Sequence, residues 1–249
     1  MSRQARWIRT EQSRMKYYRM AETRFYQLMR DEGNKLVDAI RTVGGGLEVI
    51  DSLEVDMRPV LLDVYRLSGR EFVNSAFNDL KGIRNLTVKA DVDDYWESSM
   101  VFYVEKNRFP LIQSVANTYK GVLNRAIQSG VAEGLGMDEL AKRIQQVVPG
   151  LARNRAIVIA RTEVINSSNM SANFGAIASG VSLDKEWIAT MDNRTRIDHI
   201  EADAQIVGMD QPFILADGSR LMWPGDNQFS AAADQTINCR CTQGYVRPE

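Results

Sequence analysis

Three side chains with the chemistry of soft-metal ligands lie near the C-terminal end of this sequence. His199 is the only histidine among the 249 residues, and Cys239 and Cys241 are the only cysteines. In an extended backbone, residues two positions apart point to the same face, so Cys239 and Cys241 would present both sulfurs to one point. An imidazole nitrogen from a neighbouring turn or helix would add a third donor, and zinc prefers this mixture of thiolate and imidazole. The sequence therefore predicts a zinc site at these three residues.

The fourth ligand of this site has three carboxylate candidates, which are Asp192, Asp198 and Asp203. We expect Asp192, because a turn at residues 192–193 can swing its side chain back, whereas Asp198 adjoins His199 and would point elsewhere on a helix. If no carboxylate reaches the metal, water takes the fourth place, as in catalytic zinc sites. The alternative without a metal is a hydrogen-bonded core histidine beside two cysteines that act as small buried hydrophobes. A disulfide within Cys-X-Cys would close a very small, strained ring.

Composition is typical of a globular protein of one large or two small domains. Hydrophobic residues make up 44% and charged residues 25%, and the formal net charge of -1 excludes a polyanion-binding protein by bulk charge. No apolar run approaches the roughly 20 residues of a membrane span, and the first residues lack the apolar core of a secretory signal. Two cysteines one residue apart exclude a disulfide framework and favour a reducing compartment, with the cytosol as the place of synthesis.

Apolar spacing and helix breakers predict a chain that is helical up to about residue 180. A first helix over residues 1–43 would end at Gly44-Gly45-Gly46. We expect further helices from about residue 56, from about residue 93 to Pro110, and over 111–131, with a turn at 81–86. A short amphipathic helix would start at Met137 and stop at Pro149-Gly150, and a long helix would then run to Gly180.

The pattern changes at residue 182, where strand and turn signals begin. We expect a strand at 183–189, a turn at 192–193, a short helix around His199, a hairpin turning at Asp217-Gly218 and an extended segment at 237–241. The predicted fold class is α+β, mostly α: an N-terminal helical assembly followed by a small β-rich, zinc-stapled C-terminal domain. The expected division is 1–110, 111–180 and 181–249.

Residues 1–30 form a basic stretch, with eight Lys and Arg against two Glu. One interpretation is an arm that binds nucleic acid or an acidic partner. The other is a solvated helix face whose charges are balanced by acids elsewhere. The candidate contact residues are Arg3, Arg6, Arg9, Arg14, Lys16 and Arg19.

A second charged set consists of Arg161, Glu163, Arg194 and Arg196. These residues would suit phosphate binding or stabilisation of a developing charge. We favour the simpler interpretation, in which an Arg and a Glu inside a long helix pair with neighbouring elements and fix their register. The sequence has no G-x-x-x-x-G-K-[ST], G-x-S-x-G or H-E-x-x-H motif, so nucleotide hydrolysis, serine hydrolysis and zincin chemistry have no direct support.

The order of five motifs resembles the phage Mu F-like head morphogenesis family, over about residues 112–241. The motifs are G-L-G-M-D-E-L-A-K-R-I, R-A-I-V-I-A-R-T-E, W-I-A-T-M-D-N-R-T-R-I-D-H, the pair P-F and P-G-D, and N-C-R-C. The family's histidine and cysteine pattern falls on His199, Cys239 and Cys241. A departure follows the histidine, where the family often has a glycine and this chain reads E-A-D-A-Q, with Ala204 before Gln205.

The resemblance implies a minor head (minor capsid) protein of a tailed double-stranded DNA bacteriophage. Such a protein would be made in the host cytoplasm and sit in few copies in the virion head near the portal. Its partners would be the portal protein or the major capsid protein, with packaged DNA as a further contact. We expect a structural and assembly role rather than an enzyme. The alternatives are a metal-dependent nuclease or hydrolase carried in the virion, with Asp192 or Glu163 as base, and a DNA-binding module resting on residues 1–30.

Overall fold

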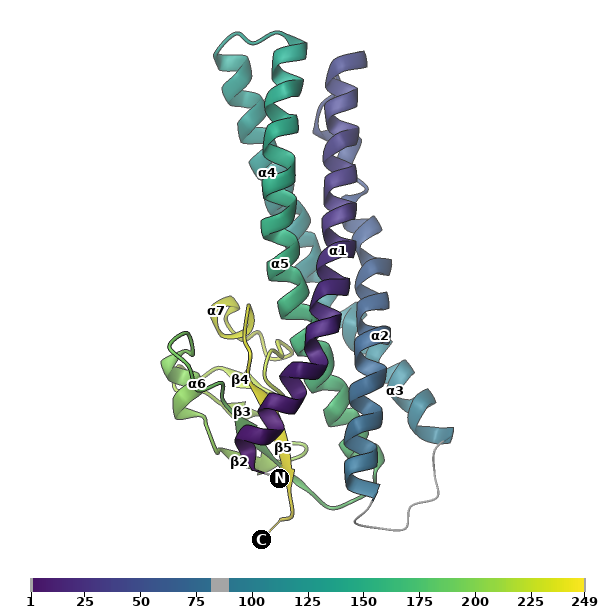
Figure 1. Ribbon diagram of the computed structural model, residues 1–249, viewed down its shortest axis with the longest axis vertical. Coiled ribbons are helices and arrows are strands. Elements are labelled where there is room, and N and C mark those ends of the chain that lie inside the picture. Colours follow the sequence, from purple (N-terminus) through teal and green to yellow (C-terminus); the bar gives the residue numbers. More distant parts are fainter. Residues whose placement is uncertain (1, 82–89, 249) are drawn as a thin grey trace.

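The computed structural model describes residues 2–81 and 90–248, and it shows an elongated molecule (Figure 1). Long helices run along the long axis, and a small mixed domain lies at one side towards the end that holds both termini. Apart from Lys81, the turn expected at 81–86 lies outside the described residues. The structure is mostly helical with small antiparallel sheets near the C-terminus, which confirms the predicted α+β class.

The first helix, α1 (Arg3–Val43), has the expected length because its cap residues define both ends. The side chain of Ser2 accepts a hydrogen bond from the backbone N–H of Ala5 at the start of the helix. Gly44 has a φ of 64° at the other end, a left-handed conformation that glycine adopts without steric cost. The glycine triplet therefore ends α1 as predicted.

Three further helical segments precede α5, at positions close to those predicted. Pro110 stands in the first turn of α4, where a missing N–H costs no helical hydrogen bond, and a π-helical turn fills the break before it. After a 3₁₀ turn at Leu47–Ile50, the elements are α2 (Leu53–Lys81), α3 (Ala90–Tyr103), the π-helical turn (Val104–Arg108) and α4 (Phe109–Ala132).

The prediction of two helices separated at Pro149-Gly150 is wrong. A single helix, α5 (Met137–Ala178), passes through Pro149 without a break. An internal proline costs a helix about 3 kcal/mol. Burial continues on both sides of it, with Val148 1% and Ala152 0% exposed, so the face that packs on the neighbouring helices is uninterrupted. Tertiary packing along α1 and α2 outweighs the local cost. Gly180, with a φ of 63°, ends the segment as expected.

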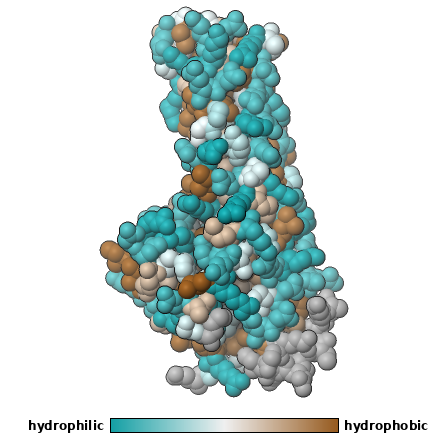
Figure 2. All heavy atoms as spheres, viewed as in Figure 1, coloured by the Kyte–Doolittle hydropathy of each residue, from teal (hydrophilic) through white to brown (hydrophobic). Residues whose placement is uncertain are grey.

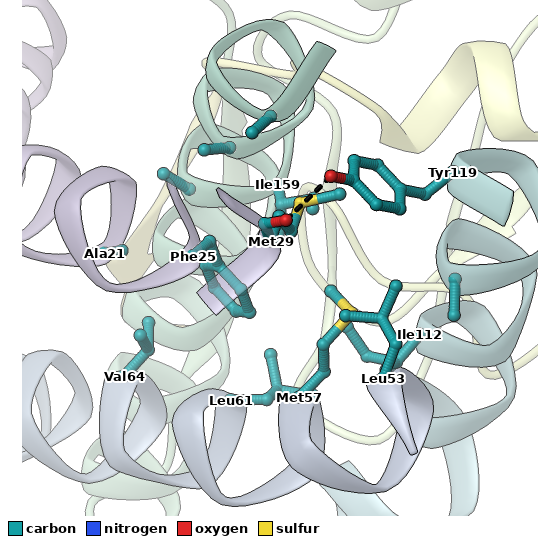
Figure 3. Packing of buried hydrophobic residues seen from close by; sticks show 14 of the residues in the cluster. Ala21, Phe25, Met29, Leu53, Met57, Leu61, Val64, Ile112, Tyr119 and Ile159 are labelled. Atoms are coloured by element: carbon teal, nitrogen blue, oxygen red, sulfur yellow. Dashed lines mark hydrogen bonds between the residues drawn. The ribbon is translucent and has the colours of Figure 1, made fainter. Parts of the chain in front are cut away.

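One hydrophobic core joins α1, α2, α4 and α5 (Figure 3). Phe25 of α1, Leu61 of α2 and Ile159 of α5 are all buried in it, and each such side chain contributes about 1.5–3 kcal/mol on burial. The hydroxyl of Tyr119 on α4 donates a hydrogen bond of 2.7 Å to the carbonyl oxygen of Met29. The helices before and after residue 110 therefore share their core.

A buried polar stripe runs along α5 from Asn166 to Asn173, next to that core. Its small side chains allow close approach, and shortly after it a Cβ atom on Gly175 would lie 2.5 Å from the carbonyl oxygen of Val73 on α2. Most of its hydroxyls and amides have hydrogen-bond partners on other elements, for example Ser68 and the indole of Trp96, whereas Oδ1 of Asn173 is buried without a partner among the described residues. This stripe is where α5 meets the C-terminal domain.

The C-terminal domain has a three-stranded antiparallel sheet of order β2-β1-β5 and a separate hairpin, β3-β4. The hairpin turns at Asp217-Gly218 as predicted, with Gly218 at a φ of 83°. Residues 237–241 are less regular than expected, because Asn238 has a φ of 55° and only the chain after Cys241 enters a strand. The bounds are β1 (Asp184–Ile188), α6 (Ile197–Glu201), β2 (Ile206–Gly208), β3 (Phe213–Ile214), β4 (Arg220–Leu221), α7 (Ala233–Thr236) and β5 (Thr242–Val246).

The surface is mostly hydrophilic on the face shown in Figure 2, with hydrophobic residues scattered rather than gathered along one helix. Over the described ranges, every helix is too short or too polar to cross a lipid bilayer.

Candidate metal centre

Strand pairing brings the cysteines to the histidine. In the β1-β5 register, Thr242 lies opposite Ile188, so the preceding Cys241 falls beside the segment that leaves β1 and leads to α6. His199 is on α6, and all three donor residues are about 1% exposed. The two cysteines belong to a small core of the C-terminal domain, and the ring of Trp187 from this core meets the imidazole of His199 edge-on, with the ring centroids 5.3 Å apart.

The spacing of the donor atoms matches a tetrahedral zinc site. The Nδ1 atom of His199 is 3.4 Å from the sulfur of Cys241 and 3.7 Å from that of Cys239. With Zn–S of about 2.3 Å and Zn–N of about 2.0 Å, a tetrahedral angle gives an N···S edge of ~3.5 Å. All three donor atoms lie within 4.8 Å of one another. The arrangement also permits weak S–H···N hydrogen bonds, so the geometry fits a metal without requiring one.

Hydrogen bonding within the cluster favours a thiolate. The Cys241 thiol donates to Cys239, and this contact, opposed by burial and aided by His199, holds the pKa of Cys239 well below its ordinary value. The same contact, together with burial, raises the pKa of Cys241 well above its ordinary value, while the backbone N–H of Thr190 and the indole of Trp187 act the other way. Thiolates are the forms that bind zinc. The Thr190 hydroxyl is buried without a partner among the described residues.

A hydrogen-bond chain directs Nδ1 of His199 towards the sulfurs. The amide nitrogen of Gln235 donates to Asp198 at 2.6 Å and to Asp217 at 2.9 Å, which fixes the orientation of the amide. Its oxygen therefore faces Nε2 of His199, at 3.1 Å, and accepts a hydrogen bond from it. With the proton on Nε2, Nδ1 presents its lone pair to the cysteines. Metal-binding histidines have this type of outer partner.

Replacing Gln235 with Leu is expected to weaken zinc binding by about 10–100-fold, the usual effect of losing such a partner. The reason is that Nε2–H of His199 would be buried without an acceptor, and the ring would lose its fixed orientation. Competition with a chromogenic chelator measures the affinity. Gln211→Leu, at an exposed glutamine of the same domain, is the matched control. An unchanged affinity in Gln235→Leu, or an equal loss in the control, would contradict the assigned role.

Asp192, the carboxylate expected as fourth ligand, is bound elsewhere in this structure. Its two oxygens accept hydrogen bonds of 2.5 and 2.6 Å from the guanidinium of Arg240, and one oxygen also accepts from the N–H of Arg194. The Arg240 hydrogen bonds hold the pKa of Asp192 well below its ordinary value. Among the residues that the structure describes, the cluster of potential metal ligands consists of His199 and the two cysteines. Arg240, between the cysteines, faces Asp192 rather than the donor cluster.

The turn after α6 contains a position whose backbone geometry would favour glycine. Ala204 has a φ of 68°, in the left-handed region that costs a residue with a Cβ about 1–2 kcal/mol. Its N–H donates a hydrogen bond of 3.0 Å to the carbonyl oxygen of Trp187, which ties the end of α6 to β1. The position therefore has the backbone geometry of a glycine although the residue is alanine.

Glu163 pairs with an arginine of the N-terminal half. This agrees with the simpler interpretation of the second charged set, in which charged residues of the long helix pair with neighbouring elements. Two hydrogen bonds, of 3.0 and 2.6 Å, join its carboxylate to the guanidinium of Arg108 in the π-helical turn, and Tyr65 donates a third, of 2.9 Å. Arg161 is exposed on α5. Arg196 donates to the carbonyl oxygen of Ile237 at 2.6 Å.

The basic residues of α1 mostly contact this chain's own acids and polar groups. Arg3 pairs with Glu186 and Asp203, which fastens the start of α1 to the C-terminal domain. The stretch is therefore part of the folded body rather than a free arm. Arg9 pairs with Asp79, Lys16 pairs with Glu71, and Arg14 is fully buried against Ser168 and Asn169. Arg6 lies beside Gly244, and Arg19 is exposed.

Asn169 links α5 to residues 237–241, the segment that carries both cysteines and is called the metal segment below. Sequence reasoning did not single out Asn169. Its amide nitrogen donates to the carbonyl oxygens of Pro224 and Cys241, at 2.8 and 3.1 Å. Its oxygen accepts from Arg14 and Thr242. The only signal in the sequence is a polar run inside an otherwise apolar helix, which shows that the face is unusual but names no partner.

Comparison with known proteins places the chain in a family. A family model described as phage Mu protein F like protein matches residues 121–244. The chain belongs to this family. It is also 30% identical over 145 residues to the minor head protein GP7 of Bacillus phage SPP1, which covers 57% of this chain and 43% of that protein. The match confirms the family resemblance drawn from the motifs.

Two other relatives align with much the same share of the chain. An NAD(+)–arginine ADP-ribosyltransferase of Enterococcus faecalis is 31% identical over 140 residues, which is 55% of this chain and 26% of that protein. The uncharacterized protein YqbB of Bacillus subtilis is 25% identical over 133 residues, 52% of this chain and 42% of that protein. This Mu F-like chain spans less than half the length of each of these relatives. No solved structure matches it.

The region matched by the family contains the whole candidate metal centre. Residues 121–244 include His199, Gln235 and both cysteines, together with the whole of α5. Helices α1, α2 and α3 lie outside it. In this member of the family, the matched region is therefore packed against a helix that lies wholly outside it, through contacts of Arg3 with Glu186 and Asp203 and of Arg14 with α5 and Thr242.

Proposed function

We propose that this protein is a minor head protein that acts in phage head assembly near the portal, with one structural zinc ion in its C-terminal domain. Membership of the Mu F-like family and the similarity to a minor head protein support the head assignment. The virion is then its final location. The portal protein or the major capsid protein would be its partner, with packaged DNA as a further contact through Arg6 and Arg19, two basic residues of α1 that form no ion pair with a described residue.

The observation that carries the zinc proposal is the buried donor triad with its fixed histidine. Two sulfurs and one nitrogen at tetrahedral spacing form a donor set of the type that zinc prefers over magnesium or calcium. The surrounding core is small, and domains of this size gain most from a metal. Zinc would supply a structural link between α6 and the segment before β5.

The fourth ligand is assigned to a solvent molecule in this proposal. Asp192 would join the metal only by leaving Arg240, to which both of its oxygens are hydrogen-bonded. Thr190 is next to Cys241 and has a buried hydroxyl without a described partner, so it is a suitable group to hold a water there. If the Asp192→Asn variant bound less zinc than the wild-type protein, Asp192 would be a ligand after all.

The hydrolase hypothesis has less support. A catalytic zinc must be reached by substrate, whereas the three donor residues are about 1% exposed. Both carboxylates considered as its base, Asp192 and Glu163, are paired with arginines. The burial of the donors therefore favours a structural metal.

Two measurements test the proposal. Elemental analysis of protein expressed without added metal is expected to give about one zinc per chain, as three protein donors and one ion require. Quantitative mass spectrometry of purified virions is expected to find the chain in far fewer copies than the major capsid protein. Metal-free protein would contradict the zinc assignment, and absence from virions would contradict the head assignment.

A further inference from the structure

A cavity of about 610 Å³ lies between the metal segment and the long helices, and it is rich in arginine. Three stretches far apart in the sequence form its walls: the first half of α1, the middle of α5, and the loops on either side of the metal donors. The arginines that line it are Arg19, Arg161, Arg194, Arg196 and Arg240.

These arginines differ in how many hydrogen bonds and ion pairs they already form within this chain. Arg240 is bound by Asp192, and Arg196 donates to a backbone carbonyl. The side chains of Arg19 and Arg161 are exposed and have no hydrogen bond or ion pair to any described residue. Arg194 lies 4.0 Å from Asp192 and is exposed. Arg19 and Arg161, on two different walls, are therefore free to donate into the cavity, and Arg194 is held only by a long ion pair with Asp192.

The acidic groups of the cavity only partly offset this charge, because two glutamates face five arginines. Glu11 accepts from Tyr18 and lies 3.6 Å from the buried guanidinium of Arg14, so its charge is offset from outside the cavity. Glu22 is the other acid of the wall. Cationic groups that converge in a concave site favour an anionic ligand.

The rest of the wall is apolar and aromatic, which narrows the class of ligand. The apolar and aromatic side chains are Trp7, Met15, Tyr18, Ile157, Ala160 and Ile165. A DNA duplex is convex, and its phosphates would reach only the rim of such a hollow. A peptide with carboxylate and apolar side chains matches both parts of the wall, because guanidinium groups bind carboxylates in a bidentate manner and the floor accepts apolar groups.

We propose that this cavity, the arginine pocket, binds an acidic peptide segment with interspersed apolar residues from another protein. Arg19 and Arg161 are its main anchors, and α1 supplies one whole wall. Because α1 lies outside the region matched by the family, that wall belongs to this chain's own N-terminal half. The pocket is separate from the buried donor triad. The proposal that it binds a peptide is therefore independent of the zinc assignment and of the head assignment.

Fluorescence anisotropy of the full chain tests the proposal with a short labelled peptide of repeating Glu-Glu-Leu. We expect saturable binding that weakens with added salt, and at least about a tenfold loss of affinity in the double variant Arg19→Ala/Arg161→Ala, because charge-assisted hydrogen bonds are lost. Glu22→Gln is expected to tighten binding, since it removes the acid that opposes the ligand. Arg125→Ala, at an exposed arginine of α4 outside the pocket, is expected to leave affinity unchanged.

Specific outcomes would overturn the proposal. A Lys-Lys-Leu peptide that binds equally well, no binding of the acidic peptide, or full binding by the double variant would each do so. Tighter binding of a labelled single-stranded oligonucleotide, lost in the same double variant, would assign the pocket to nucleic acid instead. Both replaced arginines are exposed, so circular dichroism is expected to show an unchanged fold, and zinc content serves as a check on the metal centre.

Discussion

Replacing Cys239 with Ser is expected to remove the zinc and to unfold the C-terminal domain at a markedly lower temperature. At free zinc a thousand times above its dissociation constant, binding stabilises the folded state by about 4 kcal/mol. For a chain of this size, that corresponds to roughly 8–16 °C in the midpoint of thermal unfolding. The far-UV signal is expected to fall only slightly, because most of the helix lies in α1, α2, α4 and α5.

Chelation separates loss of the metal from loss of packing. A strong chelator is expected to lower the midpoint of the wild-type protein to that of Cys239→Ser and to leave the variant itself unchanged. If His199 and the cysteines were only packing residues, the chelator would have no effect on either protein. The variant would then lose only the small free energy of exchanging a buried thiol for a hydroxyl, about 1 kcal/mol. Differential scanning calorimetry with and without chelator distinguishes the two cases.

The donor triad was predictable because its residue types are rare in this chain. One histidine and two cysteines within a short stretch are a signal that needs no structure, and the distances among them agree with the expectation. The surrounding groups could not be predicted in this way. Gln235 and Asn169 are common residue types, and their roles depend on partners that the fold brings from far away in the sequence. For Asp192, sequence reasoning did not include the competition from Arg240.

The helical half shows the same contrast between local and tertiary control. The end of α1 at Gly44 follows from local chemistry, because three consecutive glycines cannot continue a helix cheaply. The continuity of α5 through Pro149 does not, because it depends on the face that the helix buries against its neighbours. The partner of Glu163 could not be predicted from the sequence either, because Arg108 is 55 residues away and lies in a π-helical turn.

This buried ion pair is the other site where a single substitution is expected to have a large effect. Arg108 is 1% and Glu163 5% exposed, and the pair connects α5 to the break between α3 and α4. Burial would by itself lower the pKa of Arg108, but Glu163 and nearby tyrosines raise it well above its ordinary value, so Arg108 keeps its charge in the interior. Each charge is stable in the interior only because the other is present.

Replacing Glu163 with Leu is expected to lower the free energy of unfolding by about 3–5 kcal/mol, because it leaves the charge of Arg108 buried without its partner. Chemical denaturation monitored by circular dichroism measures this change. Glu97→Gln serves as the control, since its ion pair with Arg66 is solvent-exposed and should contribute at most about 1 kcal/mol.

The double variant Arg108→Met/Glu163→Leu separates the contribution of the pair from the effect of an unpaired charge. Removing both charges is expected to restore most of the stability lost in Glu163→Leu, because apolar residues of similar size replace a buried ion pair at little cost. Restoration would be incomplete, since Tyr65 and Asn227 would each lose a hydrogen-bond partner. If the double variant were as unstable as the single one, the loss would come from packing or from these hydrogen bonds. The pair would then join α5 to the N-terminal helices through its shape and not its charge.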